Sequence, residues 1–154
     1  MLIKNPNIML RSFTKTLALV LFATATFTAC KKNHDDDSLA ITKENLVATY
    51  TLSSMKMKGT NYPEADVTSQ FYDACERDDQ TVLKSDGTMS YVDAGTKCSS
   101  AGDYTSTWSI SGSKITIDGD EYTVKSLTKG QLVYEVSSTY SGQTVTVTYT
   151  YSRK

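Results

Sequence analysis

Apolar and polar residues alternate strictly near the C-terminus of the chain. Between residues 144 and 151, Val and Tyr fall on one side of the alternation and Thr on the other. A period of two is typical of a β-strand, because successive side chains of a strand point to opposite faces. We therefore predict a strand with one buried face and one solvated face.

Seven further segments show strand-like patterns, and turn-forming residues separate most of them. Ser85-Asp86-Gly87 and Asp118-Gly119-Asp120 are examples, because glycine supplies the positive φ that tight hairpins need. Eight antiparallel strands in meander order favour an all-β fold closed into a barrel, since closure removes the exposed edges of a sheet. A flattened β-sandwich is the alternative. The predicted strands span Leu46–Met57, Gln80–Lys84, Thr88–Asp93, Thr105–Ile110, Lys114–Asp118, Glu121–Leu127, Gln131–Tyr140 and Thr144–Tyr151.

Three parts of this pattern are irregular. In the first predicted strand the apolar positions shift by one residue between Leu52 and Met55, which indicates a β-bulge near Ser53-Ser54. Residues 59–70 lack a strong periodicity and predict a polar crossover loop. Residues 71–79 predict a turn of helix or an irregular lid.

Basic, apolar and then small residues follow one another at the N-terminus, in the order of a bacterial lipoprotein signal peptide. Residues 17–27 form the apolar stretch, and Phe-Thr-Ala-Cys at 27–30 resembles a lipobox. A transmembrane helix needs about 20 apolar residues, whereas this run has about 11. We predict that residues 1–29 are removed and that Cys30 carries lipid. An unlipidated secreted protein and a retained membrane anchor are the alternatives.

Residues 30–41 predict a flexible lipid-anchored tether, and residues 42–154 predict the folded domain. The tether is polar and has no apolar periodicity, so we expect it to stay solvated. Its acidic run at residues 35–37 resembles the export signal of Bacteroidetes surface lipoproteins. This resemblance implies an outer-membrane lipoprotein on the cell surface, and a periplasm-facing lipoprotein is the alternative. Asp37-Ser38-Leu39 resembles the O-glycosylation triplet of the same group, which makes Ser38 a candidate acceptor.

The charge balance becomes mildly acidic once the leader is removed. The precursor has 16 basic and 17 acidic residues, and the leader holds three of the basic residues and no acidic one, so the mature chain has a net charge of −4. No basic stripe is left for nucleic acid. The remaining length suits one domain, which we expect to be monomeric.

Cys75 and Cys98 remain as an even pair when Cys30 is lipidated. In an oxidising compartment such a pair predicts a disulfide. A bridge closing a loop of about 22 residues contributes on the order of 3 kcal/mol to stability. Two buried free thiols are the alternative, and a metal site has less support because two sulfurs without a nearby histidine do not complete a tetrahedral ligand set.

Catalysis has little support in the sequence. The only histidine, His34, lies in the predicted tether, so the folded domain has no histidine for a catalytic triad or a typical metal site. Asp73, Glu76, Asp78 and Asp79 could in principle act on a glycan, but a solvated loop with turn-forming acids explains them more simply. We predict a non-enzymatic protein without catalytic residues, cofactor or metal ion.

Binding of a small molecule has more support. An eight-stranded barrel is just wide enough either to be filled by its own side chains or to hold one small ligand. The first hypothesis is a lipid-anchored carrier of a small hydrophobic ligand, and the second is a surface interaction or structural module with a filled core. The volume inside the barrel discriminates them. Candidate ligand-binding residues, each an aromatic side chain expected to point inward from a different strand, are Tyr50, Tyr91, Trp108, Tyr122, Tyr134 and Tyr149.

Four short motifs resemble the lipocalin-like domain family of Bacteroidetes lipoproteins. They are an acidic segment around the first cysteine (73–79), an Asp-Gly hairpin (83–88), the second cysteine (97–98) and a Trp-Ser strand (107–110). The resemblance extends from Leu46 to about Tyr151, and it implies a small lipocalin-like β-barrel with a pocket for a small apolar ligand. The chain departs from the family at Ala48-Thr49-Tyr50, where a Gly-x-Trp step is common.

Overall fold

The computed structural model describes residues 37–98 and 102–154. The predicted signal peptide 1–29, the predicted lipidation site Cys30 and the first part of the predicted tether lie outside the described residues. In the part of the chain that is described, no helix has both the length and the apolar character needed to cross a membrane.

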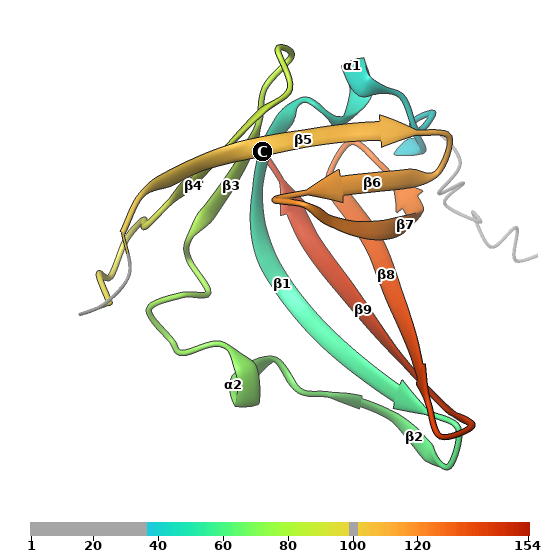
Figure 1. Ribbon diagram of the computed structural model, residues 1–154. Helices are drawn as coiled ribbons and strands as arrows, with labels where there is room; N and C mark the ends of the chain where they lie inside the picture. Colours follow the sequence, from blue (N-terminus) through green and yellow to red (C-terminus); the bar gives the residue numbers. More distant parts are fainter. Residues whose placement is uncertain (1–36, 99–101) are drawn as a thin grey trace, which may run out of the picture. The chain divides into compact units, whose positions relative to one another are not determined.

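The described residues form nine antiparallel strands and two single-turn helices (Figure 1). The helices are α1 (Lys43–Leu46) and α2 (Thr68–Phe71). The strands are β1 (Ala48–Gly59), β2 (Tyr62–Asp66), β3 (Gln80–Leu83), β4 (Thr88–Val92), β5 (Tyr104–Ser111), β6 (Lys114–Ile117), β7 (Asp120–Leu127), β8 (Gln131–Tyr140) and β9 (Gln143–Arg153).

The sheet closes on itself because the last strand pairs with the first. From β3 to β9 each strand pairs with its neighbour in sequence, and β9 returns to pair with β1 from Tyr50↔Arg153 to Gly59↔Val145. β1 in turn pairs with β3, which completes a ring of eight strands. The prediction of an all-β meander barrel is confirmed, and the sandwich alternative is wrong.

A ninth strand was not expected from the sequence. The prediction of eight strands describes the ring, but β2 pairs with β1 outside it, through Lys56↔Asp66 and Met57↔Ala65. All five residues of β2 are exposed. Because neither face of β2 packs on the core, its sequence carries no alternation, and residues 59–70 were predicted as a loop for that reason.

The first strand begins later than predicted and contains the predicted bulge. Leu46 is the last residue of α1. Thr42 caps the start of this helix by accepting a hydrogen bond from the Asn45 amide at 3.3 Å. The register of β1 against β9 then shifts between Leu52 and Ser54. This shift moves the buried positions from even to odd numbers and confirms the predicted bulge.

Apolar side chains fill one end of the barrel, which we call the apolar end. Its centre is Trp108, whose indole donates a hydrogen bond to the Lys84 carbonyl at 2.8 Å. Tyr50 stands where the Trp of the family's common Gly-x-Trp step would be, and its hydroxyl donates a hydrogen bond to the Leu46 carbonyl at 2.8 Å. The buried side chains of this end are Leu46, Tyr50, Leu83, Trp108, Ile115, Val124, Leu127 and Leu132.

The end of the predicted tether runs against this apolar end. Ser38 forms a bridge with Thr128, and the Leu39 amide donates to the Leu127 carbonyl at 2.9 Å. Leu39 and Ile41 are partly buried against the core, so the expectation of a solvated tether up to residue 41 is not met here. Both side chains are apolar and lie just before the predicted domain start at residue 42, and burying them lowers the free energy of the folded state. Ser38 itself is exposed.

Candidate functional site

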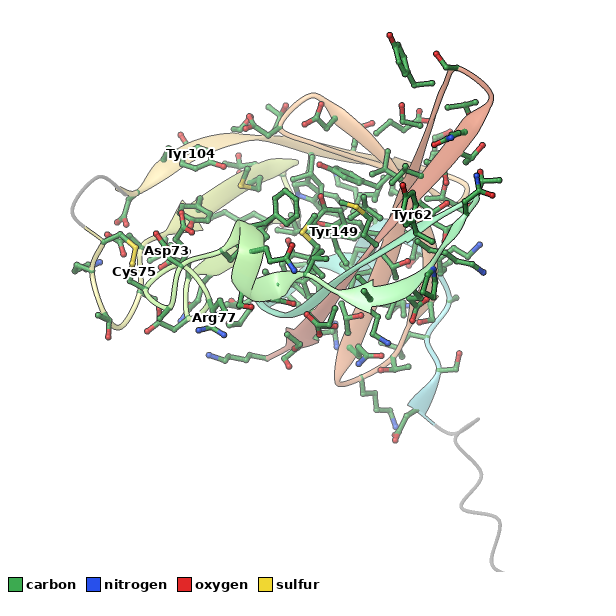
Figure 2. The ribbon with its side chains drawn as sticks, turned by 90° about the horizontal axis from the view of Figure 1, so that it is seen from below. Tyr62, Asp73, Cys75, Arg77, Tyr104 and Tyr149 are labelled. Carbon is green, nitrogen blue, oxygen red and sulfur yellow. A yellow bond between two sulfur atoms is a disulfide. The ribbon has the colours of Figure 1, made fainter. Side chains whose placement is uncertain are left out.

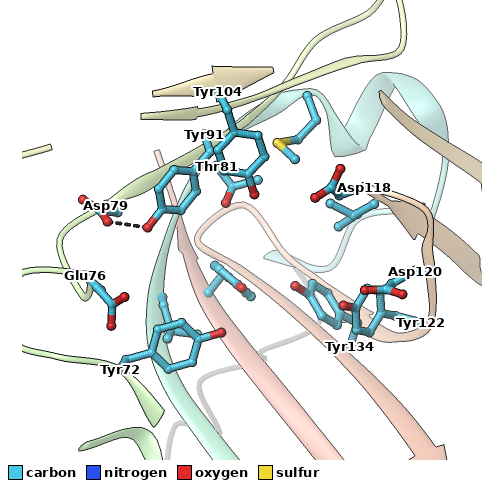
Figure 3. A pocket seen from close by; sticks show the side chains of 14 residues that line it. Tyr72, Glu76, Asp79, Thr81, Tyr91, Tyr104, Asp118, Asp120, Tyr122 and Tyr134 are labelled. Carbon is cyan, nitrogen blue, oxygen red and sulfur yellow. Dashed lines mark hydrogen bonds between the residues drawn. The ribbon is translucent and has the colours of Figure 1, made fainter. Parts of the chain in front are cut away.

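A cavity of about 250 Å³ lies at the other end of the barrel, which we call the tyrosine end (Figure 3). The two ends lie on the same strands. Leu83 and Leu132 belong to the apolar end, whereas the residues two positions away on the same strand faces, Thr81 and Tyr134, line the cavity. The lining residues are Leu52, Tyr72, Glu76, Asp79, Thr81, Met89, Tyr91, Tyr104, Ile117, Asp118, Asp120, Tyr122, Tyr134 and Tyr151.

Tyrosine is the dominant residue type of this wall. The rings pack against one another in two groups. Tyr91 and Tyr104 stack with centroids 5.1 Å apart, while Tyr134 lies 4.7 Å from Tyr122 and 5.4 Å from Tyr151. Such ring pairs hold each other in place, and the phenol groups combine an apolar body with a polar tip. The wall therefore presents rigid aromatic faces to anything in the cavity.

The segment between α2 and β3 forms a second part of the wall. A disulfide joins Cys75 to Cys98, with 5.4 Å between the Cα atoms, and so ties this segment to the loop after β4. Figure 2 shows Cys75 beside Asp73 at the edge of the barrel. The predicted disulfide is present, and the segment from residue 72 to residue 79 has no regular strand or helix.

Two acidic residues of this segment, Asp78 and Asp79, accept hydrogen bonds from the loop after β4 or from β4 itself. Asp79 accepts a hydrogen bond from the Tyr91 hydroxyl and one from the Ala94 amide at 2.9 Å. Asp78 accepts from the Thr96 amide at 3.0 Å. Asp79 is only 5% exposed. The expectation of a solvated acidic loop is therefore wrong for Asp79, because Tyr91 of β4 and Ala94 of the loop after β4 both donate hydrogen bonds to it.

The hairpin between β6 and β7 forms the opposite wall. Asp118 and Gly119 take φ values of 53° and 90°, the left-handed conformation that a tight turn requires and that Asp tolerates better than most side chains. Asp118 and Asp120 then face the cavity from either side of Gly119. The predicted hairpin is confirmed, and it brings two carboxylates to the site.

Burial and nearby carboxylates keep the phenols of the wall protonated. Burial and then the Asp120 carboxylate raise the pKa of Tyr122 to about 12. Burial raises the pKa of Tyr91, and its hydrogen bond to Asp79 adds to the effect. Burial and then Asp118 raise the pKa of Tyr104. At neutral pH these phenols are therefore uncharged, and the carboxylates give the cavity a negative potential.

The structure divides the predicted ligand-binding residues into two groups. Tyr91, Tyr122 and Tyr134 line the cavity. Tyr149 packs behind it, 5.3 Å from the Tyr134 ring and 5.9 Å from the Tyr122 ring. Tyr50 and Trp108 are buried at the apolar end, away from the cavity. Their side chains point inward as predicted, but other core side chains fill the barrel around them.

Several lining residues were missed by sequence reasoning. Tyr72 lies outside every strand, and Tyr104 precedes the predicted start of its strand by one residue. Tyr151 continues the alternation of Tyr149, so the pattern itself offered a signal for it. Of the four carboxylates of the wall, Glu76, Asp79 and Asp118 come from loops and Asp120 begins β7, and no local pattern encodes how these segments fold over the barrel.

A family model described as a lipocalin-like domain matches residues 46–134. This range includes the strands from β1 to β7, the first four residues of β8 and every lining residue except Tyr151. No curated protein and no solved structure matched the chain.

Proposed function

Because the chain belongs to the lipocalin-like domain family, we propose that it is a lipid-anchored lipoprotein of the cell envelope that binds a small ligand in its barrel. The family fold is generally a non-enzymatic one that binds small hydrophobic ligands. The tyrosine end would hold the ligand, and the apolar end would hold the barrel together.

The cavity of about 250 Å³ carries this proposal. Ligand pockets for drug-sized molecules usually have about 300–1,000 Å³, so this space suits a smaller compound. A second small cavity beside Tyr50 has only about 10 Å³ and leaves the apolar end filled. The volume favours a ligand carrier over an interaction module with a filled core.

The anchoring part of the proposal depends on the N-terminal sequence. The leader pattern of residues 1–29 and the following Cys30 support lipidation, and the acidic residues 35–37 support export to the surface of an outer membrane. Changing Cys30 to Ala should move the protein from the membrane fraction to the soluble fraction. Unchanged membrane association would contradict lipidation, and a domain that resists protease on whole cells would contradict surface display.

Ligand binding can be tested with N-phenyl-1-naphthylamine, a neutral aromatic dye that fluoresces in apolar surroundings. Titration of the purified protein should give a saturable increase in fluorescence. Thr81→Trp should abolish the increase, because Thr81 lines the cavity and a larger ring would fill it.

The matched control is Ser109→Trp, because Ser109 is exposed on β5 and does not line the cavity. This variant should bind the dye like the original protein. No saturable binding by the original protein, or equal binding by Thr81→Trp, would contradict the pocket.

A further inference from the structure

The carboxylates of the pocket have no cationic partners. Glu76, Asp79, Asp118 and Asp120 line the cavity, and none of its described lining residues is Lys, Arg or His. The five ion pairs found among the described residues use other carboxylates, such as Glu121 with Lys114 at 3.2 Å. A low-dielectric wall with one sign of charge concentrates a ligand of the opposite sign.

Two of these carboxylates also lack hydrogen-bond donors. Asp79 accepts from Tyr91 and Ala94, and Glu76 accepts from the Asp73 amide at 2.7 Å. Asp118 and Asp120, in contrast, receive no side-chain hydrogen bond from the residues that the structure describes. Their oxygens are therefore available to a donor group on a ligand, which would form a charge-assisted hydrogen bond.

The tyrosine rings add a second attraction for positive charge. A cation within about 6 Å of an aromatic ring centroid is attracted by the electrons of the ring face. Tyr122 lies beside Asp120, and Tyr104 and Asp118 line the same cavity (Figure 3). The same negative potential that opposes phenolate formation favours a bound cation.

The spacing of the carboxylates suits an organic cation better than a metal ion. Glu76 and Asp79 lie on one wall of the cavity, and Asp118 and Asp120 lie on the opposite wall (Figure 3). Within the described ranges, no group of three or more His, Cys, Asp or Glu side chains is placed to hold one metal ion. A molecule with an apolar body can fill the space between the walls while its charged group reaches Asp118 and Asp120.

We propose that the pocket selects small organic cations, namely an amine or ammonium group carried on an aromatic or apolar body. This inference rests on the proposed ligand-binding function and specifies its ligand class. An uncharged or anionic ligand of the same size would leave the carboxylates unpaired, and an anion would in addition be repelled.

Three naphthalene compounds of similar size test the charge preference. They are 2-(1-naphthyl)ethylamine, which is cationic at pH 7, the uncharged 2-(1-naphthyl)ethanol and the anionic naphthalene-1-acetate, the carboxylate of naphthalene-1-acetic acid. Each competes with N-phenyl-1-naphthylamine for the purified protein. We expect the amine to displace the dye at a concentration at least ten-fold lower than the alcohol, with the acetate weakest. Added salt should reduce the difference between the amine and the alcohol, because it screens the charges.

The double variant Asp118→Asn, Asp120→Asn should bring the amine and the alcohol to nearly equal affinity. Asn keeps the side-chain shape and tolerates the positive φ of position 118. The single variant Asp120→Asn, at a position without positive φ, should reduce part of the difference between the concentrations at which the amine and the alcohol displace the dye. Glu121→Gln is the control, because Glu121 pairs with Lys114 outside the cavity, and it should keep the full preference.

The outcomes separate this inference from the proposed function. Dye binding with equal displacement by the amine and the alcohol, or stronger displacement by the acetate, would overturn the cation preference and leave the pocket intact. If calcium chloride displaced the dye at the same concentration as the amine, the inference of an organic cation would be wrong, and the pocket would bind a metal ion instead. If neither the dye nor any naphthalene compound binds, the proposed function and this inference fail together.

Discussion

The two ends of the barrel share the same strands but differ in what their side chains do. At the apolar end, Leu83, Ile115 and Leu132 are almost completely buried and leave almost no free volume. At the tyrosine end, phenols and carboxylates surround a cavity of about 250 Å³. The apolar end stabilises the fold by excluding water from its side chains, whereas the tyrosine end keeps polar groups with which a ligand can interact. A small barrel can thus divide stability and binding between its two ends.

The largest effect is expected from a cavity cut into the apolar end. Leu83→Ala removes most of a side chain that is 1% exposed, and such changes lower the free energy of unfolding by about 2–5 kcal/mol. Urea unfolding measures this, with the fluorescence of the single tryptophan, Trp108, as the signal. Val145→Ala, at a position that is 36% exposed, should change stability by less than about 0.5 kcal/mol. Similar losses in both variants would contradict a solid apolar end.

Removal of the disulfide should have the next largest effect, and it should act on the tyrosine end. The double variant Cys75→Ser, Cys98→Ser opens a loop with a sequence separation of 23, which costs about 3 kcal/mol by the loop-entropy estimate. Dye binding should weaken as well, because Asp79 and its donor Ala94 lie on the two linked segments. Thermal melts and dye titrations measure the two effects. Melting and binding like those of the original protein would show that the bridge does not support the wall.

Gly95 should show a smaller effect at the same place. It has a φ of 62°, and a Cβ atom there would collide with the Asp78 carboxylate. Gly95→Ala should lower the free energy of unfolding by about 1–2 kcal/mol from backbone conformation alone. Gly130→Ala is the control, since nothing lies within 4 Å of its added Cβ. Equal urea midpoints for the two variants would show that neither the positive φ of Gly95 nor its contact with Asp78 constrains this loop.

The smallest effect should be a dependence on alkaline pH. The pKa of Tyr122 rises from 10.0 to about 12 in the folded protein. Between these values the unfolded chain loses the phenolic proton and the folded protein keeps it, so the free energy of unfolding should fall as the pH rises from 10 to 12. Below pH 10 both states are protonated, and this group adds no slope. Urea unfolding across this range should show a shallower fall for Tyr122→Phe.

Tyr140→Phe provides the comparison for this measurement. Tyr140 is 84% exposed at the β8–β9 turn, so removing its hydroxyl should leave the pH slope as it is. A slope that changes equally in the two variants would show that the buried wall is not responsible.

The two ends also differed in how far the sequence predicted them. The strands of the ring follow from alternation and turn residues, since each strand has an inner and an outer face. Leu132 and Tyr134 could be predicted to point inward for this reason. Alternation does not tell which level of the barrel is filled, so Tyr50 and Trp108 were grouped with Tyr122 although they pack in the solid end.

The acidic wall depended on tertiary structure that no local pattern reports. Glu76 and Asp79 reach the cavity because the disulfide holds their segment against the loop after β4. Asp118 was recognised as a turn residue, but its position over the cavity follows from the closure of the ring. β2 was missed because its five residues are all exposed, so pairing with β1 alone stabilises it.

Native mass spectrometry of the protein isolated from its own cells, with detergent removed in the gas phase, is the direct test for a bound ligand. We expect an additional mass on the original protein and on Ser109→Trp that denaturation removes, and no additional mass on Thr81→Trp. If each of the three proteins appears only at its own calculated mass, with no added mass, a ligand at the tyrosine end would be contradicted.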